Sequence, residues 1–220
     1  MKKWSAFVEV MKLKFRKFYI KKTSANRKKK IRNYGFTIIS NNCWGGFIYQ
    51  SYALKYNTPT IGLFFMADDY IRFISNLKHY INFDEIKFIE SKNSKYYDKI
   101  KEKDNFGKYP IGRIDDIEIH FLHYHTNEEA LKKWNERKKR INYDCILYKF
   151  SDMNFCTEKD IKNFINLGYK NKICFVSKKY KNFKNDYIFV VRKDSLQVKA
   201  SDEPFGNSKI VNINQIINEL

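Results

Sequence analysis

The residues best suited to chemistry lie in one turn, Ser40-Asn41-Asn42-Cys43-Trp44-Gly45-Gly46. The turn follows an apolar run and precedes a helical pattern, and its adjacent glycines allow the backbone to approach a ligand closely. A helix N-terminus there offers N–H donors and partial positive charge to an anion. Cys43 in that field is predicted to have a depressed pKa and to act as a nucleophile. The alternative is an Asn-capped turn in which Cys43 and Trp44 pack inward.

Two carboxylates follow the next apolar run. Asp68 and Asp69 come after Pro59–Phe65, which is predicted to be a strand, and before a helix predicted for Tyr70–Tyr80. One acid suffices to cap that helix. The other is available as a base, as a ligand for a divalent metal, or as a partner for sugar hydroxyls.

Three histidines lie close together in the sequence, at positions 120, 123 and 125. A strand predicted for Ile117–Tyr124 would place His123 and His125 on one face, near its carboxyl end, and His120 on the other. His123 or His125 could serve as the base that activates a nucleophile, or both could bind a metal. No third metal ligand is identifiable, and His120 is interpreted as structural.

The elements that must position these residues alternate between strand and helix. Further strands are predicted at 36–39, 86–90, 145–150, 173–177 and 187–191, and helices at 47–56, 127–140, 157–167 and 211–220. This alternation predicts an α/β fold with a mixed, mostly parallel sheet covered by helices on both faces. Ligands then bind beyond the carboxyl ends of strands, where the three candidate loops lie.

The positive charge is unevenly distributed. The chain has 220 residues and a net charge of +19, but residues 1–32 hold thirteen Lys and Arg against one acid, Glu9. The first part of this segment is predicted to be a basic amphipathic helix. Lys21–Arg32 is predicted to be a solvated linker, with a break at Thr23–Asn26. Such a helix suits an anionic membrane surface; alternatively, its apolar stripe packs on the protein's own body or on a second subunit. The apolar residues concerned are Trp4, Phe7, Val8, Met11, Phe15, Phe18 and Tyr19.

The four cysteines show no pairing pattern, and no apolar run is long enough to span a bilayer. We therefore expect free thiols and a cytoplasmic location. Residues 1–32 could in addition bring the protein into peripheral contact with the inner face of the cell membrane. Lysine, asparagine and isoleucine are all abundant, so part of the basicity reflects composition. A nucleic-acid partner is not favoured.

Several motifs occur together in an order that resembles a known bacterial family, DUF1919. They are the turn at 40–46, Thr58–Phe65 with Asp69-Tyr70, Tyr109–Gly112 with Asp116–Tyr124, and Lys133-Trp134 with Arg140–Asn142. Members of that family are often described as exopolysaccharide or capsule biosynthesis proteins and sometimes as acyltransferases. The resemblance covers about Tyr34 to Val191 and implies two α/β lobes. We place them at residues 33–125 and 126–220, after the basic segment 1–32.

The leading hypothesis is a transferase that moves an acyl group, most simply acetyl from acetyl-CoA, to a polysaccharide precursor. Cys43 is the nucleophile or lies beside the oxyanion site, N–H groups after Gly45 hold the developing charge, and His123 or His125 is the base. Asp69 binds sugar hydroxyls. The second hypothesis is a transferase for a nucleotide sugar, in which the turn binds phosphate and Asp68 or Asp69 binds a divalent metal. The third is a non-enzymatic module that docks on anionic membrane or nucleic acid.

Overall fold

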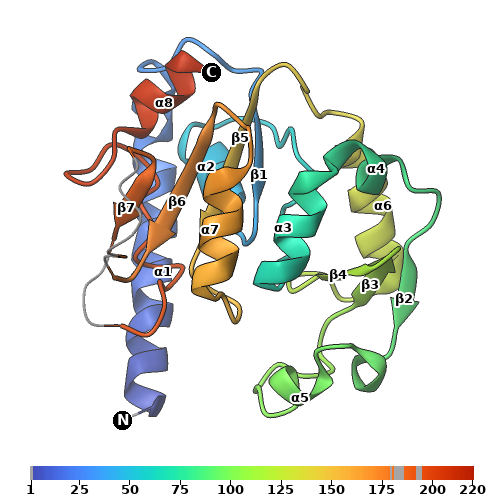
Figure 1. The fold of residues 1–220 in the computed structure, drawn as a ribbon. Coiled ribbons are helices and arrows are strands. Elements are labelled where there is room, and N and C mark those ends of the chain that lie inside the picture. Colours follow the sequence, from blue (N-terminus) through green and yellow to red (C-terminus); the bar gives the residue numbers. More distant parts are fainter. Residues whose placement is uncertain (1, 179, 181–185, 192–194) are drawn as a thin grey trace.

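The computed structural model confirms the α/β class and separates its strands into two sheets (Figure 1). It describes residues 2–178, 180, 186–191 and 195–220, without the side chains of residues 2–6. Parallel and antiparallel pairing were expected within one mixed sheet. They occur instead in a four-stranded parallel sheet and a three-stranded antiparallel sheet.

The parallel sheet has the strand order β1-β5-β6-β7. Its strands are β1 (Thr37–Ser40), β5 (Ile146–Ser151), β6 (Lys172–Val176) and β7 (Ile188–Val190). The first two pair in a register that places Ser40 opposite Lys149. Because β1 precedes residue 125 and the other three strands follow it, this sheet is built from both of the predicted lobes.

Side chains alternate across the parallel sheet and divide the core in two. Ile39, Tyr148 and Cys174 enter one cluster, whereas Ile38, Leu147 and Ile173 enter the other. Helices α3 (Ala67–Ser75) and α7 (Glu158–Asn166) pack on the first cluster. Helices α2 (Trp44–Ser51) and α8 (Ile213–Glu219) pack on the second. The sheet is therefore covered on both faces, as predicted.

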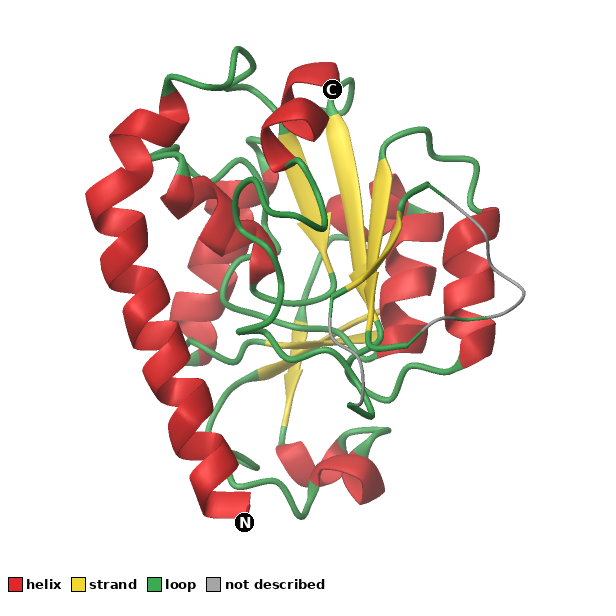
Figure 2. Cartoon of the chain, turned by 90° about the vertical axis from the view of Figure 1, so that its left-hand side faces the viewer, coloured by secondary structure: helices red, strands yellow, loops and turns green. Residues whose placement is uncertain are grey.

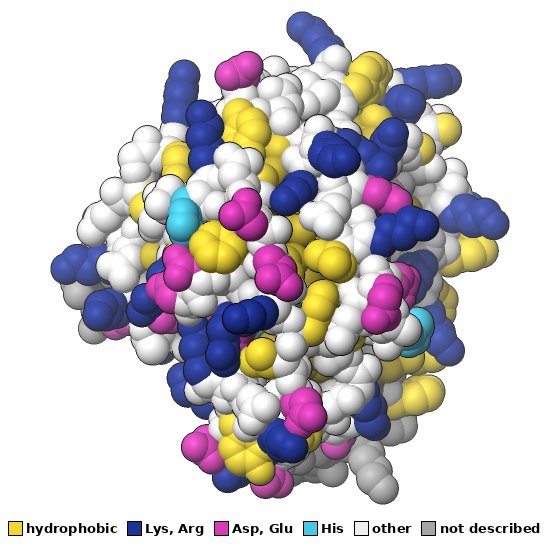
Figure 3. Space-filling model, turned by 90° about the vertical axis from the view of Figure 1, so that its right-hand side faces the viewer, with side chains coloured by type: hydrophobic (Ala, Val, Ile, Leu, Met, Phe, Trp, Pro, Cys, Tyr) yellow, Lys and Arg dark blue, Asp and Glu magenta, His cyan; other side chains and the backbone are white. Residues whose placement is uncertain are grey.

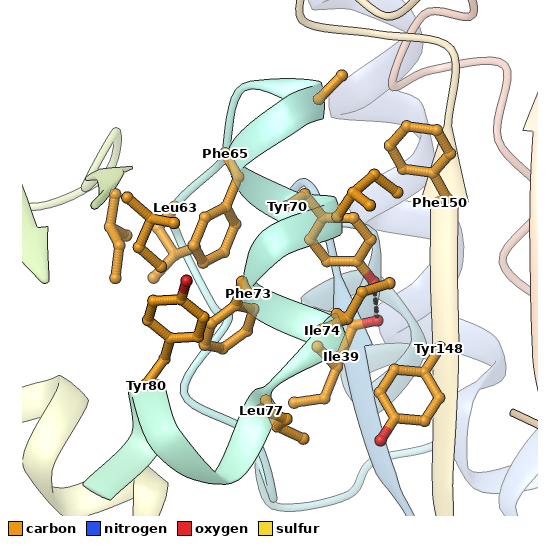
Figure 4. Packing of buried hydrophobic residues seen from close by; sticks show 14 of the residues in the cluster. Ile39, Leu63, Phe65, Tyr70, Phe73, Ile74, Leu77, Tyr80, Tyr148 and Phe150 are labelled. Atoms are coloured by element: carbon orange, nitrogen blue, oxygen red, sulfur yellow. Dashed lines mark hydrogen bonds between the residues drawn. The ribbon is translucent and has the colours of Figure 1, made fainter. Parts of the chain in front are cut away.

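Tyr70 ties α3 to the parallel sheet. Its ring stacks on Phe150, and its hydroxyl donates to the carbonyl oxygens of Ile39 (2.7 Å) and Lys149 (2.8 Å) (Figure 4). The hydroxyl thus satisfies two carbonyls while the ring fills the space between α3 and the strands.

The antiparallel sheet has the order β2-β3-β4, formed by Lys87–Ile89, Ile111–Ile114 and Ile117–His120. Helices α4 (Leu77–Asn82) and α6 (Asn127–Lys138) lie nearby (Figure 1). The segment 91–108, where no helix or strand was predicted, contains the short helices η1 (Ser91–Asn93) and α5 (Tyr97–Ile100). Charged residues interrupt any apolar periodicity in these single turns, so no pattern in the sequence indicated them.

Two of the predicted strands were wrong in ways that affect the site. Residues 59–65 make only an isolated bridge between Phe64 and His120, because the segment turns at Gly62, whose φ is +72°. Strand β4 ends at His120 and not at Tyr124. The helix predicted for 70–80 is two helices, since Asn76 interrupts it.

Helix α1 (Lys2–Lys28) runs along one side of the molecule (Figure 2). The break predicted at Thr23–Asn26 is absent, and one continuous helix includes those residues. No described helix is apolar over a length that would let it cross a bilayer. On the face that carries α4 and β2, Lys and Arg are interspersed with Asp and Glu (Figure 3). That face contrasts with α1, where Glu9 is the only acid.

Candidate functional site

The turn at 40–46 directs its polar side chains into the protein. Ser40, Asn41 and Asn42 are buried, although such residues usually lie at the surface. Ser40 ends β1 and the two asparagines follow it directly, and the parallel neighbour β5 brings Lys149 and Ser151 beside them. The turn is therefore built around a buried polar group of partners.

We call these partners the sealed cluster: Asn41, Asn42, Lys149, Ser151 and Glu203. Lys149 Nζ bonds to the Glu203 carboxylate, and both side chains have 0–1% of their surface exposed. Lys149 Nζ also donates to Asn42 Oδ1 (2.9 Å) and Ser151 Oγ (3.2 Å). Asn42 Nδ2 lies 3.1 Å from both carboxylate oxygens of Glu203. Burial lowers the pKa of Lys149, and the charge of Glu203 opposes that effect.

The N–H groups at the start of α2 are already used. The Trp44 N–H donates to Asn42 Oδ1 (3.1 Å), and the Gly45 N–H approaches Ser40 Oγ (3.4 Å). The next one, at Gly46, donates to the Cys43 carbonyl (3.1 Å). The predicted oxyanion site after Gly45 is therefore wrong, because the Cys43 carbonyl accepts from both the Gly46 and the Phe47 N–H. Side chains of the turn take up the two N–H groups before them.

Trp44 packs inward, as the alternative interpretation of the turn required. It is fully buried, its ring meets the edge of Phe175 at 5.5 Å between centroids, and its Nε1–H donates to the Pro204 carbonyl. Gly45 lies close to β1, where an added Cβ would lie 3.3 Å from Ile38 Cγ2 and make a tight contact.

Cys43 and Gly46 face the other way and line a pocket of about 360 Å³, a volume ordinary for small-molecule sites. We call it the Cys43 pocket. It lies between α1, α2 and the two turns that carry Gly62 and His123. Its lining residues are Lys17, Cys43, Gly46, Phe47, Gln50, Ile61, Gly62 and His123.

Cys43 does not have the depressed pKa that was predicted for it. Burial, and then the negative charge of Glu203, raise the pKa of the Cys43 thiol to about 12. The thiol lies 3.8 Å from the Leu63 carbonyl, toward which it can donate. The helix N–H groups are occupied by other acceptors, and burial and Glu203 outweigh the charge of Lys149, which favours the thiolate. Cys43 is therefore a neutral thiol near pH 7.

His123 reaches the pocket through the turn that follows β4. Its N–H donates to the Gly62 carbonyl (2.9 Å), and Tyr124 Oη donates to the Ile61 carbonyl (2.6 Å). Burial by the pocket walls, and then the charge of Lys17, lower the pKa of the His123 imidazole below 6.5. The ring is consequently neutral near pH 7 and able to accept a proton.

His125 does not join His123. It lines a separate cavity of about 510 Å³, together with residues such as Lys92 and Lys108. The prediction that the two histidines share a face assumed a strand as far as Tyr124. Because β4 ends at His120, the following turn directs them to different pockets. His120 is fully buried and stacks on Phe64 (centroids 4.6 Å apart).

The two aspartates lie away from the Cys43 pocket. Asp69 is fully buried, with its carboxylate bonded to Lys95 Nζ (2.6 Å) and to the Glu118 N–H (2.8 Å). Burial raises its pKa, and these two bonds oppose the rise. Asp68 is exposed and pairs with Arg72 (3.1 Å). The predicted convergence of an aspartate with Cys43 is therefore wrong.

No metal centre is evident in the described part of the chain, where no three His, Cys, Asp or Glu side chains are arranged to hold an ion. All four cysteines are free thiols, as expected.

Three residues of this region were missed at the sequence level. Lys149 had a signal, because it is the one charged residue within the apolar run 145–150. Lys17 was assigned only to the basic face of the first helix, and Glu203 lies in a stretch without periodicity. Their roles depend on contacts between segments more than 50 residues apart, such as Lys149 with Glu203 and Asn42 with Glu203.

The fold and the site define an α/β protein with a small pocket beside a capped turn. Its sequence matches the DUF1919 family, a domain of unknown function, over residues 14–218. It is also 34% identical over 174 residues to an uncharacterised protein of Haemophilus influenzae. The aligned region covers 79% of this chain and 76% of that protein. The chain belongs to the DUF1919 family.

Proposed function

We propose that the protein is a transferase that moves an acetyl group from a thioester donor, acetyl-CoA, to a hydroxyl of a polysaccharide precursor. The observation that carries the proposal is the convergence of His123 and Lys17 on the Cys43 pocket. A neutral imidazole can accept the proton of the attacking hydroxyl. An ammonium group can bind an anionic part of either substrate, or the oxyanion that forms during transfer. The resemblance to exopolysaccharide biosynthesis proteins suggests the acceptor.

In this mechanism the acetyl group passes directly from donor to acceptor. The acceptor oxygen bonds to the carbonyl carbon of the thioester while His123 takes the hydroxyl proton. The C–S bond then breaks, and the departing thiolate of CoA takes that proton from the imidazolium. Direct transfer is favoured over an acetylated Cys43 because the raised pKa leaves little of that residue as thiolate.

A nucleotide-sugar transferase that uses Asp68 or Asp69 as metal ligands has less support. Neither aspartate lines the pocket, and Asp69 is bonded to Lys95.

The proposal is tested with purified protein, acetyl-CoA and a panel of hexosamine and oligosaccharide acceptors, with release of free CoA as the measurement. We expect His123→Asn to lower kcat by about 100-fold or more, the usual contribution of a general base. The matched control is His125→Asn, which leaves the rate unchanged because His125 lines another cavity. Equal losses in both variants would refute the assignment of the base.

Cys43→Ser separates direct transfer from a covalent route. Direct transfer predicts a rate within a few-fold of wild type and no acetylated protein in the intact mass spectrum after mixing with acetyl-CoA. An acetyl adduct on Cys43 that forms and decays at the turnover rate would overturn the direct mechanism.

A further inference from the structure

Helix α1 exposes several of its aromatic side chains, although Ile20 on its inner face is buried. The side chains of Phe15 and Phe18 are 68% and 60% exposed, and Phe7 is also exposed. With the half-buried Met11, these residues recur at spacings of four, four and three, which places them on one face of a helix. We call this face, Phe7, Met11, Phe15 and Phe18, the outward stripe.

The opposite face of α1 is held to the body by polar contacts. Arg16 is buried and donates to the carbonyl oxygens of Ala200 (2.8 Å), Ser201 (3.1 Å) and Glu203. Glu9 accepts from the Ser201 N–H (3.0 Å). Ile20 is buried on this same face. An amphipathic helix on a globular protein normally buries its aromatic stripe as well, so the exposure of the outward stripe is unusual.

The charge around the outward stripe has one sign. Between Lys2 and Lys28 the helix has ten basic residues and one acid, and that acid, Glu9, is turned to the body and bonded to Ser201. Lys14, Lys21 and Lys22 are exposed, and Lys22 lies over the ring of Phe18 (4.7 Å). Aromatic rings flanked by ammonium groups suit the boundary between acyl chains and anionic headgroups.

We propose that α1 docks this protein on an anionic phospholipid bilayer, with the rings of the outward stripe inserted into the interface and the flanking lysines among the headgroups. Lys17 comes from the same helix and lines the Cys43 pocket. Docking would therefore hold that pocket close to the lipid surface. The proposal does not depend on the chemistry performed in the pocket.

The test is co-sedimentation of the full-length protein with vesicles of phosphatidylcholine alone or mixed with phosphatidylglycerol. We expect binding only to the anionic vesicles. Phe15→Ser with Phe18→Ser should weaken binding about tenfold or more, because both rings lose their interfacial insertion. The matched control is Phe83→Ser with Phe155→Ser, two exposed rings outside α1, which should bind as wild type does.

A second pair of variants tests the charge. The first triple variant changes Lys14, Lys21 and Lys22 to Gln and should weaken both the binding and its dependence on salt. The control makes the same change at the exposed Lys159, Lys162 and Lys170 and should have little effect. Tryptophan emission gives a separate readout of insertion. Of the three tryptophans, Trp44 and Trp134 are already buried in the body, whereas Trp4 belongs to α1. A blue shift of the emission on adding vesicles that disappears in Trp4→Phe would therefore report on α1 alone.

Two results would overturn the proposal. In the first, the phenylalanine double variant binds anionic vesicles as tightly as wild type, so that attraction is purely electrostatic. In the second, wild type is a dimer by analytical ultracentrifugation, the same double variant is a monomer, and neither binds vesicles. The outward stripe would then be an interface between two copies of the chain. Thermal unfolding of each variant shows whether the fold is intact.

Discussion

The sealed cluster and the Cys43 pocket lie on opposite sides of one seven-residue turn and use its residues in opposite ways. Asn41 and Asn42 point inward and complete a buried ion pair between Lys149 and Glu203. Cys43 and Gly46 line the Cys43 pocket on the other side of the turn, together with Lys17 and His123. The polar residues that attract attention in the sequence are mostly structural, and the candidate chemistry depends on two residues from other elements.

Two of the three histidines in the segment 117–125 repeat this contrast. His120 is sealed against Phe64, and burial lowers the pKa of its imidazole to about 4. His123, three residues later, is exposed at the edge of the pocket. A buried imidazole with such a low pKa resists protonation, whereas one that faces a pocket can exchange protons with a substrate.

The largest expected effect comes from breaking the sealed cluster. Lys149→Met leaves the carboxylate of Glu203 buried without its cation and should lower the free energy of unfolding by about 3–5 kcal/mol, measured by urea denaturation. Lys17→Met is the matched control, since Lys17 is exposed and the change should cost under about 0.5 kcal/mol. Adding Glu203→Leu to Lys149→Met should restore much of the loss. Equal costs at the two lysines would remove the distinction between sealed and open regions.

The next effect is a pH dependence that originates at His120. The unfolded chain takes up a proton near pH 6.5, whereas native His120 does so only near pH 4. Stability is therefore lost as the pH falls, and lowering the pH from 7.5 to 5 should cost about 2 kcal/mol from this residue. His120→Phe keeps a ring against Phe64 and should flatten that slope in urea titrations across the same range. An unchanged slope would mean that His120 is protonated in the native protein.

The smallest effect sharpens the position of His123. Gly62→Ala places a Cβ 3.1 Å from the Tyr124 ring in a residue whose φ is +72°, and we expect a loss of about 1–2 kcal/mol. Gly107→Ala is the control for backbone strain alone, because Gly107 has the same φ and no atom within 4 Å of the added Cβ. The excess cost at Gly62, measured by thermal unfolding, reports the steric contact. A cost at Gly62 no larger than at Gly107 would mean that the turn shifts freely.

The sequence predicted most elements of the sheet but not the path between them. Patterns of β-branched and aromatic residues located β1, β5, β6 and β7 to within a few residues. The segment 59–65 has the same composition as a strand, yet the turn at Gly62 prevents continuous pairing. Periodicity reports burial, and buried extended segments that pair with no strand look the same as buried strands.

The candidate site could be predicted only in part for a related reason. Cys43 and His123 were singled out, and both line one pocket. The direction of the Cys43 pKa shift was predicted wrongly, because the shift depends first on burial and then on Glu203, which is distant in sequence. Ser40 and Asn42 also accept from the helix N–H groups that were expected to favour the thiolate. Asp69 looked available from its position, but Lys95 binds it. Local spacing does not specify such partners.

Glu203 is held from two sides: its main-chain carbonyl by Arg16 of α1, and its carboxylate by Lys149 and Asn42. The spacing of residues 200–203 is therefore fixed. The side chains of Ala200 and Ser201 matter less to Arg16, because Arg16 donates to their backbone carbonyl oxygens. Relatives can exchange side chains there without releasing the helix. Losing one residue from this short stretch would disconnect the helix and the turn together, so the segment should tolerate substitution in evolution far better than it tolerates deletion.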